Sequence, residues 1–354
     1  MVLHTKKTFK VRVQKIIGLL KDWSSVERVR LHGDRRVAAL QTAVIRATAH
    51  DERPPSRELV ERVLQAETGS RLRISHCVLL VMQRLNKTKS WVVSLKCLAL
   101  LHRSLQRGGF MYEDQVVLRF SPRNGAKNHL NLSKFRDDSS ALAWQASSWI
   151  RWYAGYLETL IKASANPPIE VNALISTTDE LMSKIVALDM LLNELGTCPS
   201  LADAASALAS HTLIQDTFRL IVKDYANKRE LLHYCLKEMS ENRIPELSGP
   251  QITQLLHACK TLSSTGASYG TLNELALSFK VAVPLPLLDH VTSTEQELLN
   301  MSEVYTAAAL RLSDAALQGK CGALIKYVAP SDPLTPPKLP GPAIFRHSKV
   351  VSSQ

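Results

Sequence analysis

The side chains best suited to metal binding occur as two short pairs in the second half of the chain. His233 and Cys235 form one pair, and His257 and Cys259 form the other. Imidazole and thiolate groups are common zinc ligands. Both pairs fall in segments with helical periodicity, where residues two apart point to nearly opposite sides of the helix. We therefore interpret all four as core or boundary residues, and we predict no metal site and no cofactor.

The motifs of common catalytic classes give no support for an enzyme. The pair Gly319 and Lys320 lacks the earlier glycine and the following Ser or Thr of a phosphate-binding loop, and the sequence has no HExxH zinc-protease motif. Asp137 and Asp138 are adjacent carboxylates, but they stand just before a predicted helix, where acidic side chains commonly cap the first turn. We expect a protein that is not an enzyme.

Charge is distributed very unevenly along the chain. Residues 1–165 hold 29 Lys and Arg against 13 Asp and Glu, a net charge of +16, whereas residues 166–354 hold 15 against 19, a net charge of −4. The basic character of the protein therefore belongs to its N-terminal half. An acidic surface or polyanion is the natural partner of such a half.

Cysteine usage and hydropathy favour a cytosolic protein. The six cysteines, at positions 77, 97, 198, 235, 259 and 321, include no CxxC pair, which is typical of reduced thiols in helices. The most apolar segment, residues 91–103, is interrupted by Lys96 and is too short to cross a bilayer. The N-terminal segment also lacks the apolar stretch of a secretory signal.

Helical periodicity recurs almost throughout, so the predicted fold class is all-α, a superhelical stack of antiparallel helices. A first helix, residues 8–22, places Val11, Ile16, Leu19 and Leu20 largely along one side. Ser56 is expected to cap a later helix. The full set of expected helices is 8–22, 37–50, 56–67, 71–85, 89–106, 141–161, 170–195, 203–242, 250–264, 271–279 and 295–327.

Three parts of the chain are expected from these boundaries. Residues 8–165 form a basic N-terminal helical domain, and residues 166–328 form a C-terminal helical extension of the same superhelix, after the break at Pro167 and Pro168. Residues 329–354, rich in proline, form a tail that we expect to be disordered.

Four sequence blocks in the first half identify a family. They are KIIGLLKD, AVIRATAHDERPPSREL, WVVSLKCLALLHRSLQRGG and NLSKFRDDSSALAWQASSWIRWYAGYLE. In this order they closely resemble the ANTH domain of clathrin assembly proteins, in the form that plants carry, from about residue 8 to at least residue 161. The resemblance implies an ENTH/ANTH-like α-solenoid.

The resemblance also implies a function. Proteins of this kind are cytosolic adaptors that bind phosphatidylinositol 4,5-bisphosphate, promote clathrin coat assembly and vesicle budding, and can select vesicle SNAREs as cargo. The implied partners are therefore a phosphoinositide-containing membrane, clathrin and vesicle SNAREs. The implied location is the cytosolic face of membranes, at clathrin-coated pits and vesicles of the plasma membrane or the Golgi.

The family's lipid site implies which residues contact the membrane, and this chain departs from it. Arg46 matches the family's first basic position, but Ser56, Glu58 and Leu59 stand where the family has two lysines and a histidine. A glutamate there repels phosphates, so we expect membrane attraction with little headgroup selectivity. The candidate phosphoinositide-binding residues are Arg46, Arg53, Arg57, Arg62 and Lys10.

Two other functions remain open at this point. The basic half could bind nucleic acid, with Trp144, Trp149 and Trp152 stacking on bases, although their helical spacing fits core packing better. Alternatively, the chain could be a scaffold that binds a SNARE or another protein, with weakened lipid binding. The family blocks favour the membrane role, and we expect no nucleic-acid partner.

Overall fold

The computed structural model describes most of the chain as helices joined by short turns. The described residues are 2–32, 35–65, 71–107, 114–118, 130, 132–164, 177–199, 208, 210–278 and 286–317. They contain helices and no strand, which confirms the all-α fold class. None of the described helices combines the length and the apolar character that crossing a bilayer requires.

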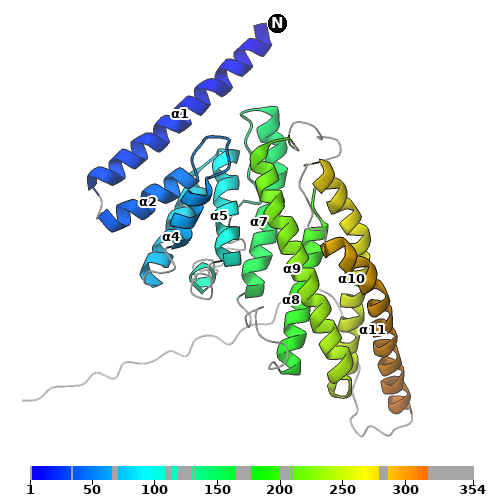
Figure 1. Cartoon of the computed structure of the whole chain (residues 1–354). Coiled ribbons are helices and arrows are strands. Elements are labelled where there is room, and N and C mark those ends of the chain that lie inside the picture. Colours follow the sequence, from blue (N-terminus) through cyan, green and yellow to red (C-terminus); the bar gives the residue numbers. More distant parts are fainter. Residues whose placement is uncertain are drawn as a thin grey trace, which may run out of the picture. The chain divides into compact units, whose positions relative to one another are not determined.

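Five helices form the N-terminal part of the stack (Figure 1). They are α1 (Val2–His32), α2 (Arg35–Ala47), α3 (Arg57–Leu64), α4 (Arg71–Lys87) and α5 (Trp91–Arg107). Helix α1 packs on α2, α2 packs on both α3 and α4, and α4 packs on α5. Each of these helices thus lies against at least one other member of the group, as expected for a stack.

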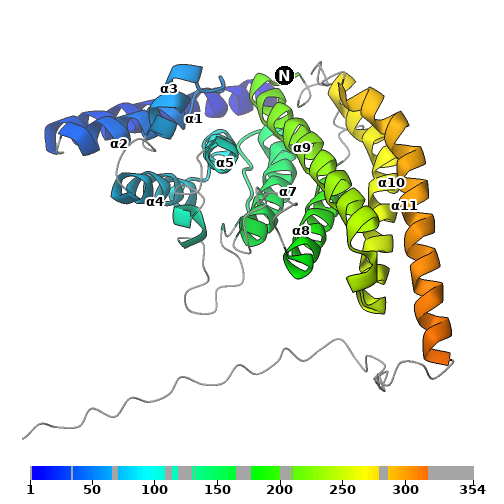
Figure 2. The ribbon, with the colours of Figure 1, turned by 60° about the horizontal axis from the view of Figure 1, so that its bottom comes forward.

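The stack continues through the longer helices of the second half (Figure 2). These are α7 (Ala141–Ser164), α8 (Thr178–Gly196), α9 (Thr212–Asn242), α10 (Gly249–Ser278) and α11 (Pro286–Leu317), with a short 3-10 turn, η2 (Ile244–Glu246), before α10. Helix α7 packs on α5 and α8, and α10 packs on α8 and α9. The described residues up to Arg311 belong to one compact unit, and Leu312–Leu317 belong to a second.

Several predicted helix boundaries were wrong. The expected helix 203–242 begins at Thr212, and the expected helix 295–327 begins at Pro286. Helix α1 extends over Val2–His32 and is much longer than the expected 8–22. The expected helices 250–264 and 271–279 are one continuous helix, α10, because interior glycines weaken a helix by about 1 kcal/mol each without forbidding it. The proposed tail, residues 329–354, lies outside the described residues. The division near residue 165 stays a prediction.

The core is aliphatic and aromatic and runs between the helices. Trp149, Tyr153 and Tyr156 of α7 are fully buried, as is Phe218 of α9. Burying one large apolar side chain contributes about 1.5–3 kcal/mol, so the faces of α5, α7 and α9 hold the middle of the stack together. Two tyrosine hydroxyls inside it have polar partners: Tyr153 Oη lies 2.8 Å from His102 Nδ1, and Tyr156 Oη donates to Asp224.

Asp137 does not cap the helix that follows it, as the sequence predicted, but caps α5, which precedes it in the chain. Its Oδ2 accepts a hydrogen bond of 2.8 Å from the backbone N–H of Trp91, the first residue of α5. Its Oδ1 accepts another from the Ser139 N–H at 3.0 Å. The start of α7 is capped instead by Ser140, whose hydroxyl accepts from the Ala143 N–H at 3.0 Å. Asp137 thereby ties the loop before α7 to the start of α5.

His211 caps the N-terminus of α9 and makes the fold sensitive to pH. Its Nδ1 accepts a hydrogen bond of 3.2 Å from the Leu213 N–H, and its ring packs edge-on against Trp91. Burial lowers the pKa of His211 below 6.5, although nearby Glu52 acts in the opposite direction. Protonation of Nδ1 would remove the cap, because a protonated nitrogen cannot accept a hydrogen bond.

Acidification is therefore expected to destabilise the folded protein through His211. The unfolded chain takes up this proton near the ordinary pKa of about 6.5, so the stabilisation is fully present above that pH and is lost as the pH falls towards the lower folded-state pKa. Denaturation between about pH 7.5 and 5 should reveal a loss of about 1 kcal/mol, a typical N-cap contribution. The variant His211→Asn keeps a capping side chain that does not titrate. An unchanged pH slope in this variant would contradict the prediction.

Candidate functional site

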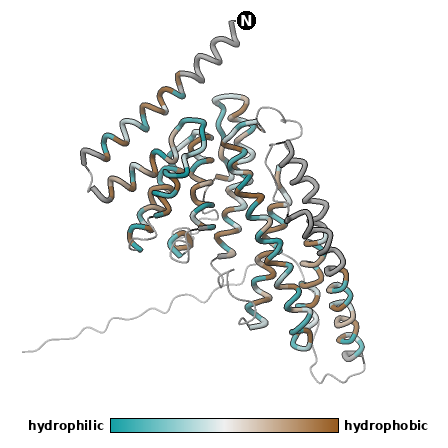
Figure 3. The backbone as a smooth tube through the Cα atoms, in the orientation of Figure 1, coloured by the Kyte–Doolittle hydropathy of each residue, from teal (hydrophilic) through white to brown (hydrophobic). Residues whose placement is uncertain are grey.

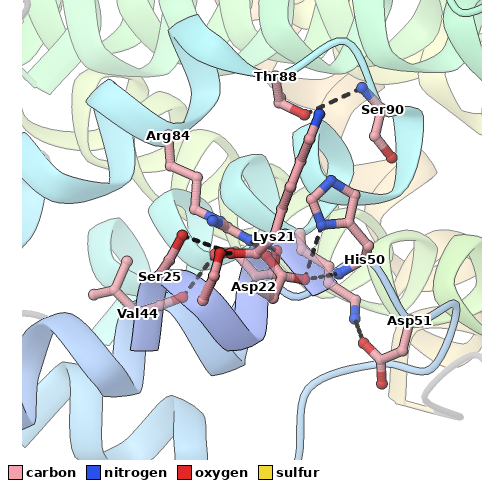
Figure 4. A network of polar contacts seen from close by, with 12 residues as sticks. Lys21, Asp22, Ser25, Val44, His50, Asp51, Arg84, Thr88 and Ser90 are labelled. Carbon is pink, nitrogen blue, oxygen red and sulfur yellow. Dashed lines mark hydrogen bonds and ion pairs between the residues drawn. The ribbon is translucent and has the colours of Figure 1, made fainter. Parts of the chain in front are cut away.

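Asp22, in α1, is the centre of a buried polar network that joins three segments (Figure 4). Its Oδ2 accepts hydrogen bonds of 2.8 Å from both the backbone N–H and the Nδ1 of His50. Its Oδ1 is paired with Nη2 of Arg84 in α4. Arg84 Nη2 also donates to the Thr48 carbonyl oxygen at 3.0 Å. The network fixes α1 against the turn that follows α2 and against α4.

Burial and ion-pair partners shift the pKa values of Asp22 and Lys96. Burial pushes the pKa of Asp22 up, but the hydrogen bonds from His50 and Arg84 and the positive charge of Arg84 outweigh it, so this pKa stays below 3.8. On the other side of the turn, the almost fully buried Lys96 of α5 pairs with Asp51. Burial lowers the pKa of Lys96 even so. The turn after α2 is thus held by the hydrogen bonds that Asp22 and Arg84 form with it and by the ion pair between Asp51 and Lys96.

Gly18 lets α1 approach this turn closely. A Cβ atom at position 18 would lie 2.8 Å from two ring carbons of His50, a distance that real Cβ atoms essentially never show. The side of α1 that carries Gly18 and Asp22 is therefore the side that packs against the rest of the protein. This contact, like the ion pair with Arg84, fixes the rotation of α1 about its own axis.

An open cleft of about 670 Å³ lies beside the network. It is lined by residues of α1, α2, the end of α4, the start of α5 and the loop before α7. In Figure 4 the Lys21 side chain extends towards Thr88 and Ser90, in the turn between α4 and α5. Five cations line the cleft: Lys15, Lys21, Arg84, Lys87 and Lys89.

The acidic residues of the cleft are already engaged. Asp22 is paired with Arg84, Glu52 is paired with Lys15 at 2.7 Å, and Asp137 caps α5. Lys21, Lys87 and Lys89, by contrast, are exposed and form no ion pair with any residue that the structure describes. The cleft therefore presents unneutralised positive charge to solvent.

The four arginines predicted for the lipid site are all exposed. Arg46 ends α2, Arg53 lies in the following turn, and Arg57 and Arg62 lie at the two ends of α3. The helical backbone at Lys10 is described as part of α1, but its side chain lies outside the described residues.

The structure does not gather these arginines into one pocket. Arg57 and Arg62 are five residues apart on α3, which places them about 140° apart around the helix axis. Arg57 Nε lies 4.0 Å from Glu61 Oε1, and the Arg57 side chain is 88% exposed. Arg46 instead lines a small hollow of about 220 Å³ together with Trp23 of α1. The predicted site is thus a diffuse basic surface.

The sequence analysis missed the lysines of the cleft. Lys87 and Lys89 flank a turn between two predicted helices, which is a local signal of an exposed basic loop. Their position beside Lys21 could not be predicted, because it depends on how α1 packs. Ser56 does cap α3 as predicted, since its hydroxyl accepts a hydrogen bond of 3.4 Å from the Leu59 N–H.

Other residues considered for chemistry take structural places. Cys235 and Cys259 are buried, and burial raises their pKa to about 11 and about 12. Among the described residues, no group of three or more His, Cys, Asp or Glu could hold a metal ion. Residues 266–270 match the GxSxG pattern, but they lie inside α10 and not at the strand-to-helix turn of a nucleophile elbow.

The tryptophans of α7 differ from one another. Trp149 is fully buried and Trp152 is partly buried against the core, which confirms packing for these two. Trp144 is 51% exposed, so core packing was wrong for it. The guanidinium of Arg136 covers its ring at 4.2 Å.

Comparisons with known proteins all indicate the same family. The model of the ANTH domain family matches residues 39–268. Similar proteins of Arabidopsis thaliana carry the name "Putative clathrin assembly protein". One, At4g40080, is 32% identical over 264 residues, which cover 70% of this chain and 71% of that protein. The others include At2g25430, 36% identical over 41% of this chain and 22% of that protein, and At1g14910, 27% identical over 91% and 47%. The matched part is thus less than half of the length of the last two.

Proposed function

The chain belongs to the ANTH domain family, and from this premise we propose that it is a peripheral membrane adaptor of clathrin coats. In this proposal the basic N-terminal half attaches to phosphoinositide-containing membranes on their cytosolic face. The protein then promotes coat assembly and vesicle budding, without catalysing a reaction.

The membrane role in this proposal is supported by four exposed cations on and near the first helices. Arg46, Lys21, Lys87 and Lys89 are exposed, and none of them forms an ion pair within the described part of the chain. Each basic side chain near an anionic leaflet contributes about 1 kcal/mol, so several together can hold a protein at a membrane. The net charge of +16 over residues 1–165 supports the same role.

The clathrin part of the proposal comes from the relatives. Proteins named for clathrin assembly resemble this chain, in one case over 71% of the relative's length. By resemblance to the family, the proposal also includes vesicle SNAREs as cargo and a location at coated pits and vesicles of the plasma membrane or the Golgi.

Charge reversal at Arg46 and Arg57 tests the membrane role. In co-sedimentation with vesicles that contain phosphatidylinositol 4,5-bisphosphate, the double variant Arg46→Glu, Arg57→Glu is expected to bind on the order of 100-fold more weakly or worse, because two cations become two anions, a change of four units of charge. Both side chains are exposed, so the fold should be unaffected.

The matched control carries the same charge change elsewhere. Lys223 of α9 and Lys260 of α10 are also exposed, and the variant Lys223→Glu, Lys260→Glu should bind almost normally. Equal losses of vesicle binding in both variants would contradict the proposed surface. A parent protein that never pellets with vesicles would contradict the membrane role. Displacement from vesicles by a low concentration of RNA would favour a nucleic-acid scaffold instead.

A further inference from the structure

The cleft beside the Asp22 network carries a group of exposed lysines. Lys21 belongs to α1, Lys87 ends α4, and Lys89 lies in the turn between α4 and α5. None of the three forms an ion pair within the described part of the chain. The Lys21 side chain extends towards this turn, so cations from two different parts of the chain gather at one place (Figure 4). We refer to these three residues as the cleft lysines.

The start of α5 is a second feature of the cleft that attracts anions. Val92 and Val93, in the first turn of α5, line the cleft. The first N–H groups of a helix have no acceptor within the helix and carry partial positive charge. The Asp137 carboxylate already binds the Trp91 N–H here, which shows that this end of α5 accepts a carboxylate. A second acidic group in the cleft meets the same end of the helix.

Apolar side chains line the cleft together with these positive charges. They come from three helices and include Ile17 of α1, Val44 of α2 and Leu80 of α4. Hydrophobic residues recur between hydrophilic ones along these helices (Figure 3). Ile17 is 45% exposed and lies one helical turn before Lys21, so an apolar group and a cation follow each other along one side of α1. A ligand that fills the cleft therefore contacts both kinds of side chain.

The size and the polar groups of the cleft suit a short peptide segment. Sites that enclose small ligands measure about 300–1,000 Å³ and combine an apolar lining with a few polar groups. The cleft, at about 670 Å³, lies within this range. Ser139 and Ser140 also line it, and serine hydroxyls can donate hydrogen bonds to the carbonyl groups of a peptide backbone.

We propose that the cleft binds a short acidic peptide segment of a partner protein, in which leucine or another apolar residue stands next to Asp or Glu. The carboxylates of the segment face the cleft lysines and the start of α5, and its apolar side chains lie against Ile17 and Leu80. The four arginines predicted for the lipid site do not line the cleft. The inference thus adds a protein partner to the proposed adaptor role, at a separate site.

A peptide fits the cleft better than a phosphoinositide headgroup. A headgroup is polar over its whole surface and places no apolar group against Ile17 or Leu80. Removing these side chains from water is favourable when a leucine or phenylalanine side chain covers them. The cleft lysines also attract an anionic membrane, so a bound acidic segment neutralises part of the charge that supports membrane attachment.

Fluorescence anisotropy with synthetic peptides tests both parts of this recognition. The probe is a fluorescein-labelled peptide in which two adjacent leucines are flanked by glutamates, and binding to the parent protein is measured without vesicles. We expect the probe to bind. Peptides with glutamine in place of glutamate, or with serine in place of leucine, should bind at least tenfold more weakly. Unchanged binding of either altered peptide would overturn the proposal, because recognition requires both charge and apolar contact.

Neutralising two cleft lysines tests where the peptide binds. Lys87→Gln, Lys89→Gln should weaken binding of the probe about tenfold, since two ion pairs with exposed side chains are lost. The matched control Lys223→Gln, Lys260→Gln makes the same charge change at exposed positions of α9 and α10. This control should bind the probe like the parent protein.

A second pair of variants tests the apolar side of the cleft. Ile17→Ser should weaken binding of the probe severalfold, because it removes an apolar side chain that lines the cleft. The control Leu72→Ser changes a side chain that is 78% exposed in the first turn of α4, at the opposite end of that helix from Lys87. It should leave peptide binding unchanged. Circular dichroism melts should be unchanged in all four variants, since every replaced side chain is exposed.

The possible outcomes separate the peptide site from the membrane role. No binding of the probe, or equal losses in Lys87→Gln, Lys89→Gln and its control, would overturn the peptide site and leave the membrane role standing. Soluble inositol trisphosphate that binds through Lys87 and Lys89, with no binding of the probe, would overturn it in favour of a headgroup site. A parent protein that binds the probe as expected but never pellets with vesicles would support the peptide site and contradict the membrane role.

Discussion

Replacing Arg84 with methionine is expected to destabilise the folded chain by about 3–5 kcal/mol, the usual cost of removing one partner of a buried ion pair. The Arg84 and Asp22 side chains are only 18% and 10% exposed. Methionine fills much of the same volume but cannot donate a hydrogen bond. Asp22 would keep only its hydrogen bonds to His50, and the Thr48 carbonyl would lose the donors that Arg84 supplies at 3.0 and 3.3 Å.

Urea denaturation measures this loss, and a surface pair provides the control. Arg71 of α4 is 64% exposed and pairs with Asp114, so Arg71→Met should cost at most about 1 kcal/mol. The double variant Asp22→Asn, Arg84→Met should recover part of the loss, because it no longer leaves a buried charge without its partner. Hydrogen exchange should also accelerate in α1. Equal costs for Arg71→Met and Arg84→Met would show that the network does not anchor α1.

Local sequence signals predicted much of the helical architecture. The 3.6-residue periodicity located α4, α5 and α7 closely, and Ser56 marked the start of α3 because a side-chain cap is a contact within four residues. The length of α1 was underestimated because its N-terminal turns lack strong periodicity. The continuity of α10 was missed, since residues 265–270 were left out of both expected helices.

The candidate site depends on contacts that no local pattern reveals. Asp22 and Arg84 are 62 residues apart, and Asp137 caps a helix that begins 46 residues earlier. The apolar periodicity of α1 could be read from the sequence, but the side of the helix that faces the core could not. The side that packs is chosen by a glycine and a buried aspartate, and neither contributes to an apolar pattern. Sequence reasoning therefore placed Ile16, Leu19 and Leu20 on one side of α1 but could not predict that these side chains are exposed.

Restoring the family's basic residues is expected to strengthen phosphoinositide binding on the order of 100-fold in the double variant Ser56→Lys, Glu58→Lys. The change amounts to three units of charge, and each unit near an anionic surface contributes about 1 kcal/mol. Ser56 and Glu58 are both exposed, at the cap and in the first turn of α3, where the helix N-terminus also favours anions. Loss of the Ser56 cap costs about 1 kcal/mol of stability, which a folded domain tolerates.

Co-sedimentation across vesicle compositions distinguishes a restored site from added charge. The control Glu230→Lys, Thr253→Lys makes the same change at exposed positions of α9 and α10, and it should bind only slightly better than the parent. If the start of α3 forms the headgroup site, the gain should be larger on phosphatidylinositol 4,5-bisphosphate than on phosphatidylserine of equal total charge. Equal gains on both lipids would mean that the surface reads only charge density. Equal gains in both variants would mean that the start of α3 does not face the membrane, because a cation acts on the bilayer only within about a Debye length of it.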